Sequence, residues 1–388
     1  PKLRFPGFDE PYKQCRIGDI YAERSQRGAS DMELLSVTMN DGVMPRSEIE
    51  GKDNSSEDKS NYKVVLTGDM VYNSMRMWQG ANGISPCDGI VSPAYTVLMP
   101  KIPICNGYFA AFFKSPNLIN EFRKNSQGMT SDTWNLKYPQ IETIKVCIPA
   151  LSEQNRVADM LGTLERRIAK QVQLVDSLKK YKRGVVRTLL TPDSCCIAGA
   201  TWTTAKIGDL GSFTKGAPLS KADIAPDGTP FILYGELYTT YHEVINSVIR
   251  RTKAQPEKQY YSHVGDVIIP TSGETPEEIS TAACVMLPDI ILAGDLNIFR
   301  SSKIDGRIMS YILNHIVNGQ IARIAQGKSV VHIQASEISK IEISYPDYNT
   351  QCKMISVFET VGARIKSAEN ELTYLRSMQK ALLQQLFI

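Results

Sequence analysis

The sequence predicts a mixed α/β (α+β) protein in which two β-rich domains are separated by two long helices that form an antiparallel coiled coil. Three observations support this fold class: an internal repeat, a four-three spacing of apolar residues in two segments, and a short linker after the first of these segments. At 388 residues, with 42% hydrophobic and 22% charged residues, the chain is long enough to form several domains with sizeable cores.

The internal repeat relates the two halves of the chain. A shift of 197 residues aligns TGDMVYNSM (67–75) with VGDVIIPTS (264–272), and it also aligns Gln154 with Gln351. Glycine followed by aspartate before a run of apolar residues is typical of a turn that leads into a strand. The repeat therefore predicts two domains of similar architecture, related by a pseudo-twofold axis.

Two further pairs of segments extend the repeat. RIGDI (16–20) matches KIGDL (206–210) at a shift of 190, and SQGMTSDTWNLKYPQIETIKVCIP (126–149) parallels AQGKSVVHIQASEISKIEISYP (325–346). Each half therefore contains an IGD opening, a GD strand, a QG loop and an Ile-rich strand that ends in proline, and a long helix follows. Shorter helices are expected in 108–125 and 306–319.

The two long helices are predicted from apolar residues that recur in alternating steps of four and three. This spacing is typical of a coiled-coil seam, and both series are interrupted at the same late position, by Lys182 and Gln379. The alternative is that two unrelated amphipathic helices pack on separate cores. The seam residues are Val157, Leu161, Leu164, Ile168, Val175, Leu178, Val185 and Leu189 in the first helix, and Met354, Phe358, Val361, Ile365, Leu372, Leu375, Leu382 and Leu386 in the second.

The ends of the helices indicate their relative direction. Ser152 and the pair Asn349-Thr350 are candidate N-caps, and Pro192 ends the first helix near Leu190. In a parallel pair, the end of one helix and the start of the next would lie about 48 Å apart, a distance that a compact domain bridges awkwardly. The antiparallel arrangement makes these ends neighbours and gives a dumbbell.

These arguments divide the chain into four parts, two domains and two helices, with boundaries at 1–150, 151–191, 192–347 and 348–388. Within each domain, short β-branched or aromatic runs bounded by Gly, Pro, Asn or Asp favour strands. Examples are NYKVVL, AYTVLMP and IEISYP.

Composition excludes several classes of protein. Forty-four Lys and Arg residues against 41 Asp and Glu give a net charge of +3, which neither requires nor excludes a DNA partner. The eight cysteines and four histidines show no metal-ligand spacing, so no metal site is expected. There is no apolar run of about 20 residues and no signal-peptide pattern, so we expect a cytoplasmic protein with reduced cysteines.

The usual catalytic motifs are absent. GQIARIAQGKS (319–329) ends in Gly-Lys-Ser, but Ala322 replaces the first glycine of a phosphate-binding loop. The sequence has no GxGxxG after a strand, no GxSxG and no Asn-Pro-Pro-aromatic motif, and its EDK triplet (57–59) lies in a polar insertion. We therefore expect no catalytic residues in this chain.

Two similar domains held apart by a coil suit an extended ligand with two separated recognition sites. Duplex DNA is such a ligand, because a pseudo-twofold protein matches two half-sites at a spacing set by geometry. A coil of about 48 Å corresponds to roughly 14 base pairs between the two domains.

Four stretches carry a specific resemblance. PKLRFPGF, LSEQNRVADMLGTLERRI, TKGAPLSKADI with LYGELYT, and the terminal KALLQQLF together resemble the specificity (S) subunit of type I restriction–modification systems. The resemblance covers essentially the whole chain, although the second helix starts with NTQCKMI where the family has EQ and a basic residue.

The resemblance implies a DNA-reading adaptor without catalytic activity of its own. Each domain would read one half of a bipartite target with a nonspecific gap. Two methylating (M) subunits would dock along the helices and carry the S-adenosylmethionine chemistry. Motor-nuclease (R) subunits would join them for cleavage that depends on ATP and Mg.

Candidate DNA contacts follow from the chemistry of base and phosphate recognition. Base readout needs polar side chains on loops, and phosphate contacts need basic side chains, hydroxyls or backbone amides. The turns after the GD strands and the QG loops offer both. The predicted contacts are Arg76, Gln79, Ser126, Gln127 and Thr130 in the first domain, and Lys215, Tyr234, Glu236, Tyr238, Thr271, Ser272, Gln326, Lys328 and Ser329 in the second.

Other interpretations stay open. Trp78 and Tyr234 also suit a half-buried place in a core, and the basic residues Lys179, Lys180, Lys182, Arg183 and Arg187 suit either a solvated helix face or a contact with DNA or an M subunit. The whole chain could instead be a self-contained DNA methyltransferase or nuclease with a cryptic site, or a two-headed coiled-coil scaffold without DNA affinity. Methyl transfer by the chain alone, or binding of DNA, separates these hypotheses.

Overall fold

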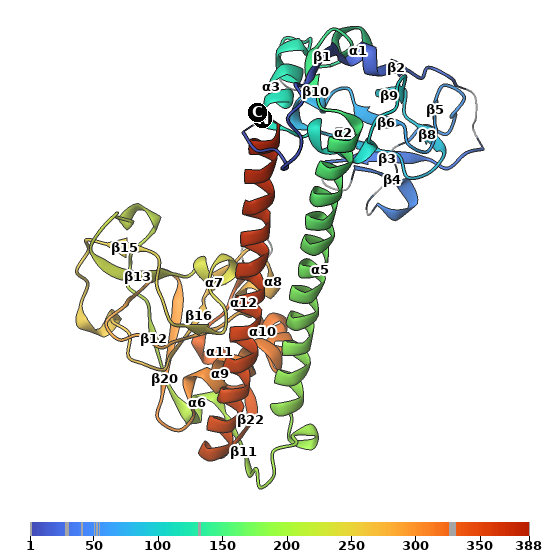
Figure 1. The fold of residues 1–388 in the computed structure, drawn as a ribbon. Coiled ribbons are helices and arrows are strands. Elements are labelled where there is room, and N and C mark those ends of the chain that lie inside the picture. The colour runs from blue at the N-terminus through green and yellow to red at the C-terminus, as the bar shows by residue number, and fades with distance from the viewer. Residues whose placement is uncertain are drawn as a thin grey trace. The chain divides into compact units, whose positions relative to one another are not determined.

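The computed structural model describes residues 2–27, 31–39, 42–49, 51, 53, 55–130, 133–325 and 331–387. The chain forms two compact units (Figure 1). The first unit contains residues 1–173 and 370–388, and the second contains residues 174–369. The mixed α/β class expected from the sequence is confirmed in both.

The first unit is built on an antiparallel sheet in the order β2-β9-β6-β7. Its strands are β2 (Tyr21–Glu23), β9 (Tyr95–Pro100), β6 (Met70–Asn73) and β7 (Asn82–Ile84). Three two-stranded pairs surround it: β1 (Lys13–Arg16) with β10 (Lys145–Ile148), β3 (Leu35–Thr38) with β4 (Gly42–Pro45), and β5 (Lys63–Val65) with β8 (Gly89–Val91). The short helices are α1 (Ile17–Ile20), α2 (Asn106–Phe112), α3 (Pro116–Asn125) and α4 (Tyr138–Ile141), with 3-10 turns at 46–48 and 77–79.

Both faces of this sheet are covered. Because side chains alternate along a strand, Met70 and Tyr72 pack with the aromatic residues of α2 and α3, whereas Val71 and Val97 pack with β3 and β4 on the other face. The sequence 108–125, where short helices were expected, forms most of α2 and all of α3.

The second unit has a larger sheet in the order β12-β20-β16-β18-β14. Its strands are β12 (Gly211–Lys215), β20 (Leu296–Ser301), β16 (Asp266–Pro270), β18 (Ala283–Val285) and β14 (Val244–Ile245). Smaller sheets are formed by β15 (Arg251–Thr252), β13 (Thr229–Leu233) and β19 (Ile291–Ala293), by β11 (Trp202–Lys206) with β22 (Glu342–Pro346), and by β17 (Ser272–Gly273) with β21 (Val331–His332). The short helices are α6 (Ile207–Leu210), α7 (Glu236–Thr239), α8 (Pro276–Ile279), α9 (Gly306–His315), α10 (Asn318–Ile324) and α11 (Ala335–Ile338), with 3-10 turns at 192–194, 221–223 and 258–260.

The predicted repeat is visible in matching turns of the two sheets. Gly68 and Gly265 have positive φ angles of 90° and 93° and stand before β6 and β16. The following residues, Asp69 and Asp266, are buried and accept a backbone hydrogen bond three residues upstream, at 2.8 Å in both units. Each of these aspartates also binds an arginine, Arg24 in the first unit and Arg300 in the second.

The two glutamines aligned by the repeat make the same contacts. Gln154 accepts from the backbone N–H of Cys105 at 3.0 Å and donates to the carbonyl of Pro149 at 3.0 Å. Gln351 accepts from the backbone N–H of Asp305 at 2.9 Å and donates to the carbonyl of Pro346 at 2.8 Å. Each glutamine thereby joins the start of a long helix to its own domain.

The long helices are α5 (Leu151–Leu189) and α12 (Tyr348–Leu386). The first ends one residue before the predicted Leu190. The predicted caps were wrong, because Ser152 and Asn349-Thr350 already lie inside the helices. The cap of α12 is Asp347, whose carboxylate accepts from the backbone N–H of Thr350 at 3.1 Å and from its hydroxyl at 2.7 Å.

The two long helices pack antiparallel within each unit (Figure 1). In the first unit, the start of α5 shares a core with the end of α12, and Arg167 forms an ion pair with Glu371 at 2.9 Å. In the second unit, the end of α5 shares a core with the start of α12, and Lys179 forms an ion pair with Glu369 at 2.8 Å.

The residues predicted as the seam lie away from solvent. Eleven of the 16 are buried: Val157, Leu161, Leu164, Val175, Leu189, Met354, Phe358, Val361, Ile365, Leu375 and Leu386. The other five are half-buried: Ile168, Leu178, Val185, Leu372 and Leu382.

All eight cysteines are free thiols. Within the part of the chain that the structure describes, His, Cys, Asp and Glu side chains do not gather into a group of three that could hold a metal ion. None of the described helices is long and apolar enough to cross a membrane.

Candidate nucleic-acid interface

In the first unit, the turn after β6 presents two of the predicted contacts. Arg76 and Gln79 are exposed, while Met77 between them is fully buried and anchors the turn in the core. Gly80 closes the turn at a φ of 88°, a conformation that favours glycine. The turn therefore holds a guanidinium and an amide in solvent on a fixed backbone.

The QG segment of the first unit lies beside this turn. Gln127 and Asn135 exchange two backbone hydrogen bonds of 2.9 and 2.8 Å, which closes the segment into a loop. The next residue, Leu136, donates its backbone N–H to the carbonyl of Ser74 at 2.8 Å and so ties the loop to the end of β6. Among the predicted contacts in this loop, Gln127 and Thr130 are exposed, whereas Ser126 is half-buried and donates its hydroxyl to Phe122 at 2.7 Å.

Two further residues of this surface were not predicted. The indole of Trp134 packs edge-on against Trp78, with ring centroids 5.1 Å apart, and the guanidinium of Arg123 lies 5.6 Å from the centre of the Trp134 ring. Both tryptophans are half-buried, as the alternative for Trp78 expected, and Arg123 is exposed. A basic residue and an aromatic residue on either side of the QG loop were the available signal in the sequence.

The second unit repeats this arrangement with different side chains. Thr271 and Ser272 follow β16, and the backbone N–H of Ile333 donates to the carbonyl of Thr271 at 3.0 Å. This bond corresponds to the one between Leu136 and Ser74 at a shift of 197 residues. Thr271 is half-buried and Ser272 is buried.

Lys215 lies at the end of the edge strand β12, opposite Asn297 of β20. Its ammonium donates to the side-chain oxygen of Asn297 at 2.8 Å. Desolvation lowers the pKa of Lys215, and the carboxylate of Asp295 acts in the opposite direction. Asp295 in turn accepts from the hydroxyl of Ser272 at 2.8 Å. The structure therefore groups two predicted residues with two that the sequence did not indicate.

The segment LYGELYT contributes supporting contacts to this group. Tyr238 donates its hydroxyl to the carbonyl of Ser272 at 2.6 Å, and burial raises the pKa of that phenol. Tyr234 is half-buried, with its ring 6.4 Å from that of Tyr238.

Glu236, a predicted DNA contact, is engaged inside the second unit. It is 6% exposed, and its carboxylate accepts from the backbone N–H of Leu233 at 3.1 Å and from the side chain of Arg250 at 3.0 Å. Both carboxylate oxygens are thus occupied by contacts that fix its own segment. The predicted contacts Gln326, Lys328 and Ser329 lie outside the described residues.

The basic end of α5 divides into paired and exposed residues. Lys182 forms an ion pair of 2.7 Å with Glu243, whose other carboxylate oxygen lies 2.8 Å from the Nε2 atom of His315. Burial opposes ionisation of Glu243, but these contacts outweigh it and lower its pKa to about 2. Lys179 is paired as described above, and the remaining basic residues of this helix end are exposed: Lys180, Arg183 and Arg187.

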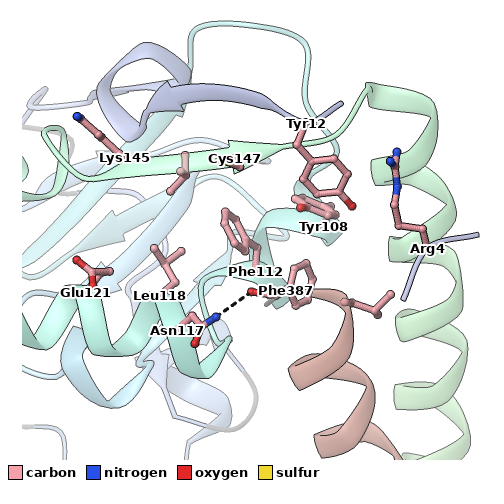
Figure 2. A pocket seen from close by; sticks show the side chains of 12 residues that line it. Arg4, Tyr12, Tyr108, Phe112, Asn117, Leu118, Glu121, Lys145, Cys147 and Phe387 are labelled. Atoms are coloured by element: carbon pink, nitrogen blue, oxygen red, sulfur yellow. Dashed lines mark hydrogen bonds between the residues drawn. The ribbon is translucent and has the colours of Figure 1, made fainter. Parts of the chain in front are cut away.

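The first unit also contains a cavity of about 490 Å³ (Figure 2). Tyr108, Phe112 and Phe387 form its apolar part, and the side-chain amide of Asn117 donates to the carbonyl of Phe387 at 3.4 Å. At its rim, Arg4 is bound by Glu153 in a bidentate ion pair of 3.0 and 2.7 Å. None of the predicted DNA contacts lines this cavity.

Comparison with known proteins gives one family and several structures of similar fold. Residues 200–375 match the family model of the type I restriction modification DNA specificity domain. A chain from a structure described as the basis of complex assembly and conformational transition of the type I R-M system has a TM-score of 0.63 and 14% identity, covering 100% of this chain and 99% of that chain.

Two crystal structures of specificity subunits are also similar in fold. The HsdS subunit from Thermoanaerobacter tengcongensis has a TM-score of 0.51 and 14% identity, covering 100% of this chain and 98% of that chain. The type I restriction–modification S subunit from M. genitalium has a TM-score of 0.60 and 13% identity, covering 100% of this chain and 99% of that chain.

Proposed function

We propose that the chain is a DNA specificity subunit of a type I restriction–modification system, in which each β-rich domain reads one half of a bipartite DNA target. In this proposal the chain recognises DNA, and the partner subunits carry the catalytic residues. The long helices would set the gap between the half-sites. DNA as the target also favours a cytoplasmic location.

The observation that carries this proposal is that two segments with different side chains are held at the same place in the two units. In both units, a main-chain hydrogen bond ties the segment after the QG loop to the turn after the GD strand, from Leu136 to Ser74 and from Ile333 to Thr271. The side chains that follow differ in chemistry between the units. A constant scaffold with different polar groups at one place is what two readers of different half-sites need.

The proposed contacts in the first unit combine charge and stacking surface. Arg76 and Gln79 would approach base edges, while Gln127, Thr130 and Arg123 would contact phosphates. Ser126 would act at the edge of this surface. In the second unit, Lys215, Thr271, Ser272, Tyr234 and Tyr238 would form the corresponding surface, with Glu236 fixing the backbone of its segment.

We further propose that the helices dock two methylating subunits. Leu174 and Tyr181 are exposed on α5 and lie seven residues apart, so they share one helix face in the second unit. Val357 is exposed on α12 in the same unit. Exposed apolar side chains on one helix face are typical of an interface that a partner covers. S-adenosylmethionine, ATP and Mg would be bound by the methylating and motor-nuclease subunits.

The test is to assemble the chain with its methylating subunits and select from a pool of randomised DNA duplexes. We expect two short sequence motifs separated by a gap of fixed length, with binding that weakens as salt rises. Methyl transfer by the chain alone would instead support a self-contained enzyme. A complex that shows no sequence preference would overturn the proposal.

A further inference from the structure

A polar cluster at the end of the second unit's main sheet joins Lys215, Asn297, Asp295 and Ser272. Lys215 and Asn297 face each other across β12 and β20, and their side chains are 2.8 Å apart. Asp295, two residues before Asn297, accepts from Ser272 at 2.8 Å. Strands β12 and β20, with the residue before β20, thus bring an ammonium and a carboxylate to the same end of the sheet.

Asn297 has no exposed surface, and among the described residues its side-chain nitrogen has no hydrogen-bond partner. Burying an amide that is only half satisfied costs free energy, so its place in the core needs a reason. Its oxygen holds the ammonium of Lys215 in one position. Lys215 keeps two further N–H donors, because no second acceptor for it is found in the described part of the chain.

The charges of the cluster balance. Asp295 is exposed and lies two residues before Asn297, and its carboxylate opposes the lowering of the pKa of Lys215 by desolvation. A carboxylate beside the ammonium weakens its attraction for phosphate, which is anionic. The Lys215 ammonium is a donor and the Asp295 carboxylate is an acceptor. Together they match the major-groove edge of a G·C base pair, where guanine offers acceptors and cytosine offers a donor.

We propose that Asn297 is a positioning residue that holds Lys215 against a guanine edge of the second half-site, while Asp295 accepts from the amino group of a cytosine. This inference rests on the proposed function, since it needs the second unit to read DNA. It assigns Lys215 to base readout rather than to phosphate binding.

The first unit offers a matched comparison for the position of Asn297. Thr96 of β9 pairs with Tyr72 of β6, as Asn297 of β20 pairs with Ile269 of β16. Thr96 is buried and shares a 2.8 Å hydrogen bond with Ser74. The first unit therefore has an uncharged hydroxyl at the position of the buried amide, so the guanine contact is expected in the second half-site alone.

The experiment uses the assembled complex with its methylating subunits and maps the methylated sequences selected by each variant. In Lys215→Met and in Asn297→Thr, which introduces the residue of the first unit, we expect the preference for guanine at one position of the second half-site to fall about tenfold. The first half-site and the slope of affinity against salt should not change. Lys221→Met, which removes an exposed lysine of the same unit, should leave both half-sites unchanged.

The double variant separates positioning from folding. If Asn297 acts through Lys215, Asn297→Thr should change nothing further in the Lys215→Met background. Equal weakening on all sequences, with a salt slope reduced by about one, would assign Lys215 to phosphate and overturn the inference. A wild-type complex without a bipartite preference would instead overturn the proposed function itself. An unchanged second half-site in both single variants would overturn the inference while leaving that function intact.

Discussion

Asp69 and Asp266 stand at the same turn of the two units, and Gln154 and Gln351 make the same pair of backbone contacts at the start of the two long helices. A few residues further along the sheets, the similarity ends. The first unit places two tryptophans and exposed arginines there, and the second places a lysine, a buried asparagine and an aspartate. The difference teaches that the polar residues at the turn and at the helix start define the scaffold, whereas the side chains at the sheet end differ between the units.

The largest effect is expected from breaking the helices that both units share. Leu164→Pro in α5 and its repeat equivalent Val361→Pro in α12 each remove a backbone hydrogen bond and a buried seam contact, so each should lower the free energy of unfolding by about 3 kcal/mol or more. Circular dichroism during urea unfolding measures this. Leu164→Met is the matched control and should cost less than about 1.5 kcal/mol. Equal stability of the proline variant and wild type would contradict an interior helical position.

A smaller effect is expected where the second unit has a half-buried cluster of Lys182, Glu243 and His315. The folded-state pKa of Glu243 is lowered to about 2 from an ordinary 4.5. A lowered carboxyl pKa stabilises the fold above about pH 4.5, and that stability is lost as the pH falls toward 2. Glu243→Gln should remove about 3 kcal/mol of this pH-dependent stability.

The measurement is urea unfolding at a series of pH values, with fluorescence of Trp202 reporting the second unit in a Trp78→Phe, Trp134→Phe background. The curve of the Glu243→Gln variant should be flatter than that of its parent between pH 4.5 and pH 2. If the two curves stay parallel, the ion pairs of Glu243 do not stabilise the second unit.

The smallest loss of stability is expected from removing the two matching glutamines, and it tests the equivalence of the two units most directly. Gln154→Ala and Gln351→Ala each leave a part-buried backbone N–H without its acceptor, so each should destabilise its own unit by about 2 kcal/mol. Because the contacts match, the two losses should agree within about 0.5 kcal/mol. Tryptophan fluorescence in backgrounds that keep either Trp202 or the Trp78–Trp134 pair assigns each loss to a unit. A clear inequality would show that the glutamines are not equivalent.

Much of the scaffold could be predicted from the sequence because it depends on local periodicity. The four-three spacing predicted both long helices, and the shift of 197 residues aligned Gln154 with Gln351, which make matching contacts. The cap of α12 was predicted two residues late, because Asn349, Thr350 and Asp347 all have side chains that favour caps.

The sheet ends were harder to predict because their chemistry depends on residues far apart in the chain. Lys215 was a candidate on its own, but its partner Asn297 lies 82 residues away and looks like an ordinary strand residue. Glu236 was predicted as a DNA contact, and only the fold reveals Arg250 as its partner inside the unit. Trp134 belongs to this surface because it packs against Trp78, which lies 56 positions earlier in the sequence. No spacing rule indicates such a contact.

The last turn of α12 has a consequence for the order of synthesis. Leu386 and Phe387 belong to the core of the first unit, and the backbone N–H of Lys2 donates to the carbonyl of Gln385 at 2.9 Å. The ribosome makes residues 174–369, the whole second unit, before it makes the segment that completes the first. At about 5 to 20 residues per second, the side of the nascent first unit around Tyr108 and Phe112 stays uncovered for about 10 to 40 s. During translation, the unit that begins first is therefore the one that finishes last.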